Sequence, residues 1–115
     1  MREIIFKAYL PKENKITFSH TLEEIVSICS LGYPDNAIWM QCTSLKDKNF
    51  KDIYEGDILG CLGFGKFRVE FFNGMFCAFK ISEESNQENA YRIDWLIKTY
   101  QMEIIANIHE NSELL

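Results

Sequence analysis

The fold class is decided by residues 67–81, FRVEFFNGMFCAFKI. This stretch consists of two runs rich in aromatic and β-branched residues, which are typical of strands, joined by Asn73-Gly74. The central residues of a type I′ turn both have positive φ, which asparagine and glycine adopt readily, and the twist of this turn matches that of paired strands. The stretch therefore predicts an antiparallel β-hairpin.

Segments on both sides of this hairpin also have strand character. Residues 58–62 precede it and residues 102–108 form an apolar run near the end of the chain. Residues 37–42 form a further mixed apolar run, and residues 3–10 and 15–18, separated by a Pro-Lys-Glu-Asn turn, predict an N-terminal hairpin. Several short strands with turn signals between them predict a mainly β protein, a small antiparallel barrel or sandwich.

Three segments have no clear strand pattern. Thr21 and Glu24 have the spacing of a helix capping box, and residues 22–29 carry apolar side chains at helical spacing, although their β-branched content leaves a strand open. Residues 91–97 could form a helical turn or a strand, because their apolar residues fit neither period cleanly. Residues 82–89, SEESNQEN, are polar and acidic and predict a mobile loop with nothing to bury.

Composition predicts one soluble globular domain. The 115 residues are 47% hydrophobic, and the net charge of −5 with a pI of about 5.0 disfavours nucleic acid and anionic membranes as partners. The N-terminal stretch has no uninterrupted apolar run, so we expect no signal peptide or membrane span and a location in the cytoplasm.

The cysteines predict buried thiols rather than a metal centre. They stand at positions 29, 42, 61 and 77 without a Cys-x-x-Cys pair, and the two histidines, His20 and His109, lie near opposite ends of the chain. In a reducing compartment a cysteine in an apolar run behaves as a small hydrophobic residue. We therefore predict free core cysteines, with no metal and no cofactor.

Three motifs follow one another in a specific order. They are Thr43-x-Leu-Lys-Asp-Lys-Asn49, Ile53-Tyr-Glu-Gly-Asp-Ile58 and Ala106-Asn-Ile-x-Glu-Asn111. In this combination the sequence resembles the YopX family, small proteins of bacteriophages and prophages, over nearly the whole chain. Two positions depart from the family pattern. Lys7-Ala8-Tyr9 stands for the usual Arg-Ala-Trp, and Phe50 stands where family members tend to have glycine.

The resemblance implies an architecture and no reaction. It implies a single domain over residues 1–115, in which residues 43–110 form an SH3-like antiparallel barrel and residues 1–42 form an N-terminal extension with a hairpin and a short helix. The family has no established biochemical role, so the resemblance supplies neither a substrate nor catalytic residues.

The segment Tyr54-Glu55-Gly56-Asp57 is interpreted as a structural turn leading into the barrel. Gly56 permits a backbone conformation that a Cβ would resist, and Asp57 can accept backbone N–H groups. Tyr54 can bury its ring while its hydroxyl reaches the surface. The alternative, a metal site formed by Asp52, Glu55 and Asp57, lacks the spacing of an EF-hand loop.

No nucleophile stands beside an identifiable base, so we expect a non-enzymatic protein. The leading hypothesis is a protein-interaction module that binds a host or phage protein through exposed aromatic residues and self-associates. The alternative is binding of single-stranded nucleic acid by the lysine-rich loop, residues 46–51. The candidate interaction residues are Trp39, Lys46, Lys48, Phe50, Lys51 and Tyr54.

Overall fold

The structure, a computed structural model, describes residues 4–25, 36–61 and 63–111. Residues 4–46 contain β1 (Ile5–Leu10), β2 (Lys15–Ile16), β3 (His20–Thr21), a helical turn at residues 22–25, and β4 (Ile38–Lys46). Residues 52–107 contain β5 (Asp52–Tyr54), β6 (Asp57–Cys61), β7 (Gly65–Phe72), β8 (Met75–Lys80), the 3₁₀ turn η1 (Gln87–Asn89), α2 (Ile93–Tyr100) and β9 (Glu103–Asn107).

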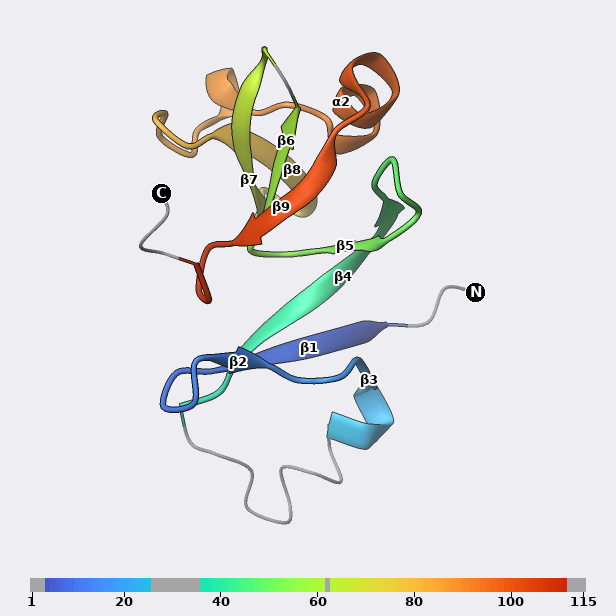
Figure 1. The fold of residues 1–115 in the computed structure, drawn as a ribbon, viewed down its shortest axis with the longest axis vertical. Coiled ribbons are helices and arrows are strands. Elements are labelled where there is room, and N and C mark those ends of the chain that lie inside the picture. Colours follow the sequence, from blue (N-terminus) through green and yellow to red (C-terminus); the bar gives the residue numbers. More distant parts are fainter. Residues whose placement is uncertain (1–3, 26–35, 62, 112–115) are drawn as a thin grey trace.

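The strands form two antiparallel sheets (Figure 1). One has the order β2-β1-β4-β5, with β3 also paired to β1, and the other has the order β8-β7-β6-β9. Strand β4 connects the two halves because it changes partner: residues up to Gln41 pair with β1, whereas Cys42 pairs with Tyr54 of β5. The predicted mainly β fold, with a small curled barrel and a short helix, is confirmed.

The predicted hairpin over residues 67–81 is confirmed. Strands β7 and β8 pair in continuous register, with Phe72 opposite Met75 across the turn. Asn73 and Gly74 have φ values of 50° and 83°, as a type I′ turn requires. The inner face of the hairpin and the elements around it bury one main cluster: Ile53, Leu59, Phe67, Val69, Ala78, Ile93, Leu96 and Met102.

Residues 91–97, which fit a helix or a strand by pattern, are divided between the two. Tyr91 forms a β-bridge with Ala78, and α2 begins two residues later. The helix buries Ile93 and Leu96 against the sheet and ends at Gln101, which has the left-handed conformation. Among the described residues, no helix is long and apolar enough to cross a membrane.

The capping box predicted at Thr21 and Glu24 is confirmed. The Thr21 N–H donates to Glu24 Oε1 at 3.1 Å, and the Glu24 N–H donates to Thr21 Oγ1 at 3.3 Å. The Thr21 N–H and the Thr21 hydroxyl both donate to the Glu24 carboxylate, and these two bonds hold its pKa below the usual value. The helix that follows covers residues 22–25, and the rest of the predicted segment, residues 26–29, lies outside the described residues.

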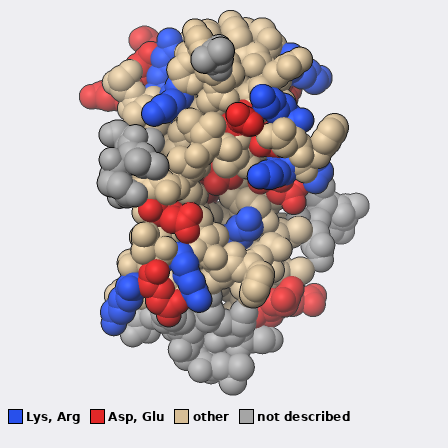
Figure 2. Space-filling view, viewed as in Figure 1, with Lys and Arg blue, Asp and Glu red and all other residues tan. Residues whose placement is uncertain are grey.

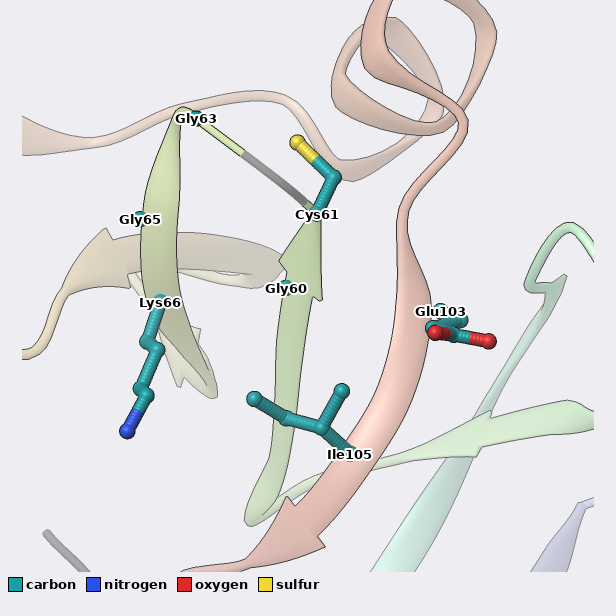
Figure 3. Close-up of a pocket in the computed structure, with 7 residues that line it drawn as sticks. All are labelled: Gly60, Cys61, Gly63, Gly65, Lys66, Glu103 and Ile105. Atoms are coloured by element: carbon teal, nitrogen blue, oxygen red, sulfur yellow. The ribbon is translucent and has the colours of Figure 1, made fainter.

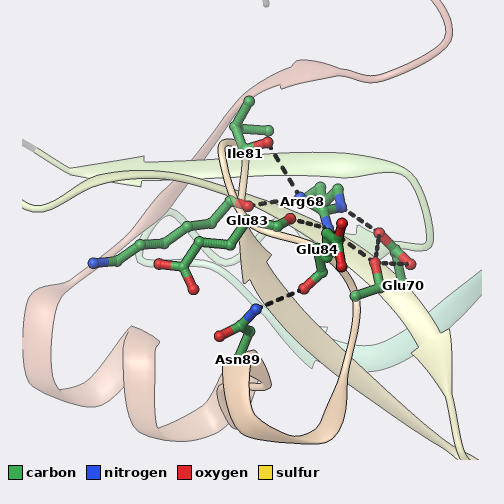
Figure 4. A network of polar contacts seen from close by, with 8 residues as sticks. Arg68, Glu70, Ile81, Glu83, Glu84 and Asn89 are labelled. Carbon is green, nitrogen blue, oxygen red and sulfur yellow. Dashed lines mark hydrogen bonds and ion pairs between the residues drawn. The ribbon is translucent and has the colours of Figure 1, made fainter.

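As predicted, residues 82–89 bury nothing, but Arg68 binds this segment through polar contacts that the sequence did not predict (Figure 4). The Arg68 guanidinium donates to the carbonyl oxygens of Lys80 and Glu83, at 2.6 Å each, and to Ser85 Oγ at 2.8 Å. Glu70 pairs with Arg68 and accepts a hydrogen bond from Ser85. Arg68 lies on the face of β7 opposite the core residues Phe67 and Val69, and its hydrogen bonds take the place of the apolar contacts that the loop lacks.

Two cysteines occupy the predicted buried positions. Cys42 and Cys77 are buried, Cys61 is half-buried, and all three are free thiols. Burial raises the pKa of both the Cys42 and the Cys77 thiol. Cys29 lies outside the described residues.

Candidate interaction site

The turn at residues 54–57 has the predicted structural role. Gly56 has φ of 92° and its N–H donates to the Val69 carbonyl oxygen at 2.8 Å. The Asp57 carboxylate accepts the Tyr54 N–H at 2.8 Å and the Asn107 side-chain amide at 3.2 Å. Burial raises the pKa of Asp57 to about 6, against the lowering effect of these two hydrogen bonds.

Asp47 organises the lysine-rich loop that follows β4. One carboxylate oxygen accepts the N–H groups of Asn49 and Lys51, both at 2.9 Å, and the other accepts the Ile104 N–H of β9 at 3.0 Å. Burial alone would raise the pKa of Asp47, but these hydrogen bonds outweigh it and the pKa is lowered. The Lys48 N–H adds a further bond to the Met102 carbonyl oxygen at 3.1 Å. The loop is therefore fixed to the barrel along its length.

Phe50 is the exposed tip of this fixed loop. Its side chain is 82% exposed and its backbone has φ of 63°, in the left-handed region that β-carbon-bearing residues avoid. Glycine would adopt this conformation without the steric cost of a Cβ. A large aromatic ring at a strained, solvent-facing position contributes nothing to the core.

Replacing Phe50 with glycine is expected to raise the free energy of unfolding by roughly 0.5–1 kcal/mol, because relief of the left-handed strain exceeds the extra freedom of glycine in the unfolded chain. Urea unfolding of the two proteins measures the difference. A glycine variant that is less stable than the parent would show that the ring packs against the protein in solution.

Phe50 stands between two surface hollows. The first encloses about 470 Å³ and is lined by Lys7, Ser19, Phe50, Lys51, Asp52, Tyr54, Asp57 and Ile104. The second encloses about 770 Å³ and is lined by Ser44, Leu45, Lys46, Asp47, Lys48, Phe50, Ile97, Lys98 and Gln101. We call the loop tip with the rims of both hollows the Phe50 ridge.

Lysine residues gather around the Phe50 ridge. Figure 2 shows basic side chains at the middle of the molecule, where the surface is hollowed and a few acidic groups lie among them. Lys46 pairs with Asp52 at 2.8 Å and Lys48 with Glu103 at 3.8 Å. No carboxylate of the described residues lies within ion-pair distance of the remaining lysines at the ridge, which are Lys7, Lys51 and Lys98.

The structure brings together four of the six candidate residues: Lys46, Lys48, Phe50 and Lys51. Tyr54 is only 4% exposed, so it belongs to the core and contributes no more than a wall of the first hollow. Trp39 is half-buried on β4, where its ring makes an edge contact with His20 at 6.3 Å between centroids. Trp39 lines neither hollow of the ridge, as far as the described residues show.

Two functional candidates, Lys7 and Lys98, were missed from the sequence. Lys7 belongs to β1 and Lys98 to α2, and both approach the loop only through the tertiary fold. The one local signal was the charge of Lys7 within an otherwise apolar strand. A lysine in such a strand usually indicates a solvent-facing position on an edge strand, so the signal did not predict that Lys7 lines a hollow.

A third hollow lies over the glycine-rich passage of β6 and β7 (Figure 3). Gly60 provides a flat floor there, since a Cβ would lie 2.9 Å from Ile105 Cδ1. Cys61, Gly63, Gly65, Lys66 and Glu103 complete the lining. Only two charged groups of opposite sign border this apolar surface, so it lacks the converging polar groups of a phosphate or substrate site.

The acidic turn does not form a metal site in this structure. Asp52 pairs with Lys46, Asp57 is engaged by backbone and amide donors, and no group of three or more His, Cys, Asp or Glu among the described residues is arranged to hold a metal ion.

A sequence profile described as YopX protein matches residues 5–115. The chain belongs to the YopX family. This family member also shares its fold with a solved structure, protein EF1440 from Enterococcus faecalis, at 21% identity, a TM-score of 0.59 and 97% coverage of each chain. At that identity the likeness shows the fold alone. No curated protein matches the chain.

Proposed function

We propose that this YopX family member is a non-enzymatic accessory protein of a phage or prophage, which binds another protein through the Phe50 ridge. The observation that carries the proposal is Phe50 itself, an aromatic ring that is 82% exposed on a fixed loop at a backbone conformation of φ 63°. Aromatic anchors dominate the energetics of protein interfaces.

The geometry of the loop supports a binding role. Because Asp47 binds the N–H groups of Asn49, Lys51 and Ile104, the loop is ordered before any partner arrives. An anchor on an ordered loop loses little conformational entropy on association, which favours affinity. The strain at Phe50 lowers stability, so the residue is better explained by binding than by folding.

Pull-down from cells that naturally produce the protein tests this function, with three baits that differ at one residue. The parent chain is compared with Phe50→Gly, which removes the ring without loss of stability. The matched control is Phe18→Ser, because Phe18 is 87% exposed but lies in the N-terminal part of the chain. We expect a protein that is retained by the parent and by Phe18→Ser and is lost at least tenfold by Phe50→Gly.

Equal capture of every enriched protein by all three baits would contradict the role of the ridge. Light scattering of the same proteins tests self-association, which we propose as a second use of this surface. A dimer that becomes monomeric in Phe50→Gly alone would assign the ridge to the self-contact.

Single-stranded nucleic acid is the alternative partner, and the gathering of Lys7, Lys51 and Lys98 around an aromatic ring is the observation that favours it. Against it, Asp52 and Glu103 lie among the lysines, and the whole chain carries a charge of −5. Fluorescence anisotropy with labelled oligonucleotides at low and high salt distinguishes the two partners.

A further inference from the structure

Lys7 occupies an unusual position for a charged residue. Side chains alternate along β1, so Lys7 lies on the same face as Ile5 and Tyr9, and both of these pack on the buried cluster of Met40, Cys42 and Tyr54. The Lys7 ammonium lies over the Tyr54 ring, 4.5 Å from its centroid. Lys7 is thus half-buried and lines the first hollow, with its ammonium against the Tyr54 ring.

The carboxylates that line the same hollow are engaged elsewhere. Asp52 pairs with Lys46, and Asp57 accepts the Tyr54 N–H and the Asn107 amide. In the part of the chain that the structure describes, neither Lys7 nor Lys51 lies within ion-pair distance of a carboxylate. Both lysines line one cavity of about 470 Å³, together with Asp52 and Asp57, whose carboxylates are already bound by other groups.

We propose that the first hollow is a receptor for a carboxylate of the protein partner, an Asp or Glu side chain that enters between Lys7 and Lys51 while a neighbouring apolar side chain packs on Phe50. This inference rests on the proposed function and adds the chemistry of the partner, an acidic segment with an apolar residue beside the acid.

The surroundings favour a protein carboxylate over a nucleic acid backbone. A strand of nucleic acid presents a row of phosphates, which would meet Asp52 and Glu103 as well as the lysines. One acidic side chain brings a single charge into a hollow that Asp52 and Asp57 line beside the two lysines, and Glu103, which pairs with Lys48, does not line this hollow. Phe50 supplies one exposed ring, whereas single-strand binding surfaces stack successive bases on several.

Lys7 also has an internal effect, because its charge lowers the pKa of Asp57. A purely structural lysine would change stability and its pH dependence when replaced, and would leave binding unaltered. Binding and unfolding must therefore be measured on the same variants.

The experiment uses the full chain and three probes. They are the blocked peptide acetyl-Glu-Phe-Glu-Phe-Glu-amide, the same peptide with Gln in place of Glu, and a twelve-nucleotide oligothymidylate. Binding is followed by shifts of backbone amide resonances at low salt. Lys7→Met keeps the length of the side chain and its packing on Tyr54, and Lys12→Met, at an exposed turn residue, removes the same charge elsewhere.

We expect the Glu peptide to bind the parent and Lys12→Met alike, shifting resonances of β1 and the loop, and to bind Lys7→Met about tenfold more weakly, as loss of one charge-assisted hydrogen bond requires. Thermal unfolding checks that Lys7→Met is folded. Any of three results would overturn the proposed receptor. The parent could bind the Gln peptide as tightly as the Glu peptide, Lys7→Met could bind the Glu peptide as tightly as the parent, or the Glu peptide could fail to bind.

Two outcomes separate this inference from the proposed function. Loss of Glu-peptide binding in Phe50→Gly but not in Lys7→Met keeps the ridge as an interaction site and overturns the carboxylate receptor. Salt-sensitive binding of oligothymidylate that exceeds peptide binding overturns both, in favour of nucleic acid.

Discussion

Replacing Asp47 with alanine is expected to lower the free energy of unfolding by about 3 kcal/mol, because three backbone N–H groups lose a charged acceptor. Asp47 is 4% exposed and binds Asn49 and Lys51 within the loop and Ile104 on β9, 57 residues away. Loss of the hydrogen bond from the Ile104 N–H accounts for most of this destabilisation, because the loop N–H groups can bond to water instead and the strand N–H cannot. Urea unfolding at neutral pH measures the change.

The control for this prediction is Asp52→Ala. Asp52 lies five residues further on, and its half-exposed side chain makes one ion pair with Lys46. Exposed pairs of this kind contribute little, so we expect a loss of no more than about 0.5 kcal/mol. If Asp47→Ala and Asp52→Ala unfolded at the same urea concentration, the role assigned to Asp47 would be refuted.

Asp47→Ala should also uncouple the loop from the barrel without unfolding the core. Amide hydrogen exchange of Asn49, Phe50 and Lys51 is expected to rise relative to that of β7 and β8. Any binding that depends on Phe50 should weaken with it, because the ring would lose its fixed position.

Asp57 is expected to make the protein more stable in mild acid than at neutral pH. Burial raises its pKa from 3.8 to about 6, so the folded state holds a proton over a range in which the unfolded state has released it. The stability that this proton supplies is complete below about pH 4 and is lost as pH rises through about 6. The difference in pKa corresponds to about 3 kcal/mol.

The variant Asp57→Asn isolates this contribution. Its unfolding free energy is measured against that of the parent at several pH values between about 4 and 8, and the difference between the two proteins should change by about 3 kcal/mol over that range. A difference that stays constant with pH would mean that Asp57 titrates normally. The titration of all other groups contributes to both proteins and cancels in the difference between their unfolding free energies.

The titration of His109 and of Asp47 affects the stability of the parent protein in the opposite direction, because both groups make it less stable as pH falls. Burial lowers the pKa of His109, whose ring stacks on Tyr9, so its contribution is lost as pH falls below about 6.5. The lowered pKa of Asp47 makes its stabilisation disappear at still lower pH. The pKa values of the two aspartates therefore shift in opposite directions. The effect of burial is much larger at Asp57 and outweighs its two donors, whereas three backbone N–H groups outweigh a smaller burial effect at Asp47.

The sequence alone determined the features that arise from neighbouring residues. The Asn73-Gly74 turn, the Thr21–Glu24 capping box and the Tyr54–Asp57 turn each depend on backbone preferences and bonds within a few residues, which any surroundings would permit.

Only the tertiary structure decided what depends on distant segments. Arg68 holds the acidic loop at residues 82–89, Asp47 reaches Ile104, and Lys7 enters a hollow beside Lys51. Residues 91–97 became a bridge and a helix because Ala78 offered the bridge a partner and the barrel offered the helix an apolar surface. Charged residues look alike in a sequence, whereas their roles depend on which donors, acceptors and rings the fold places around them.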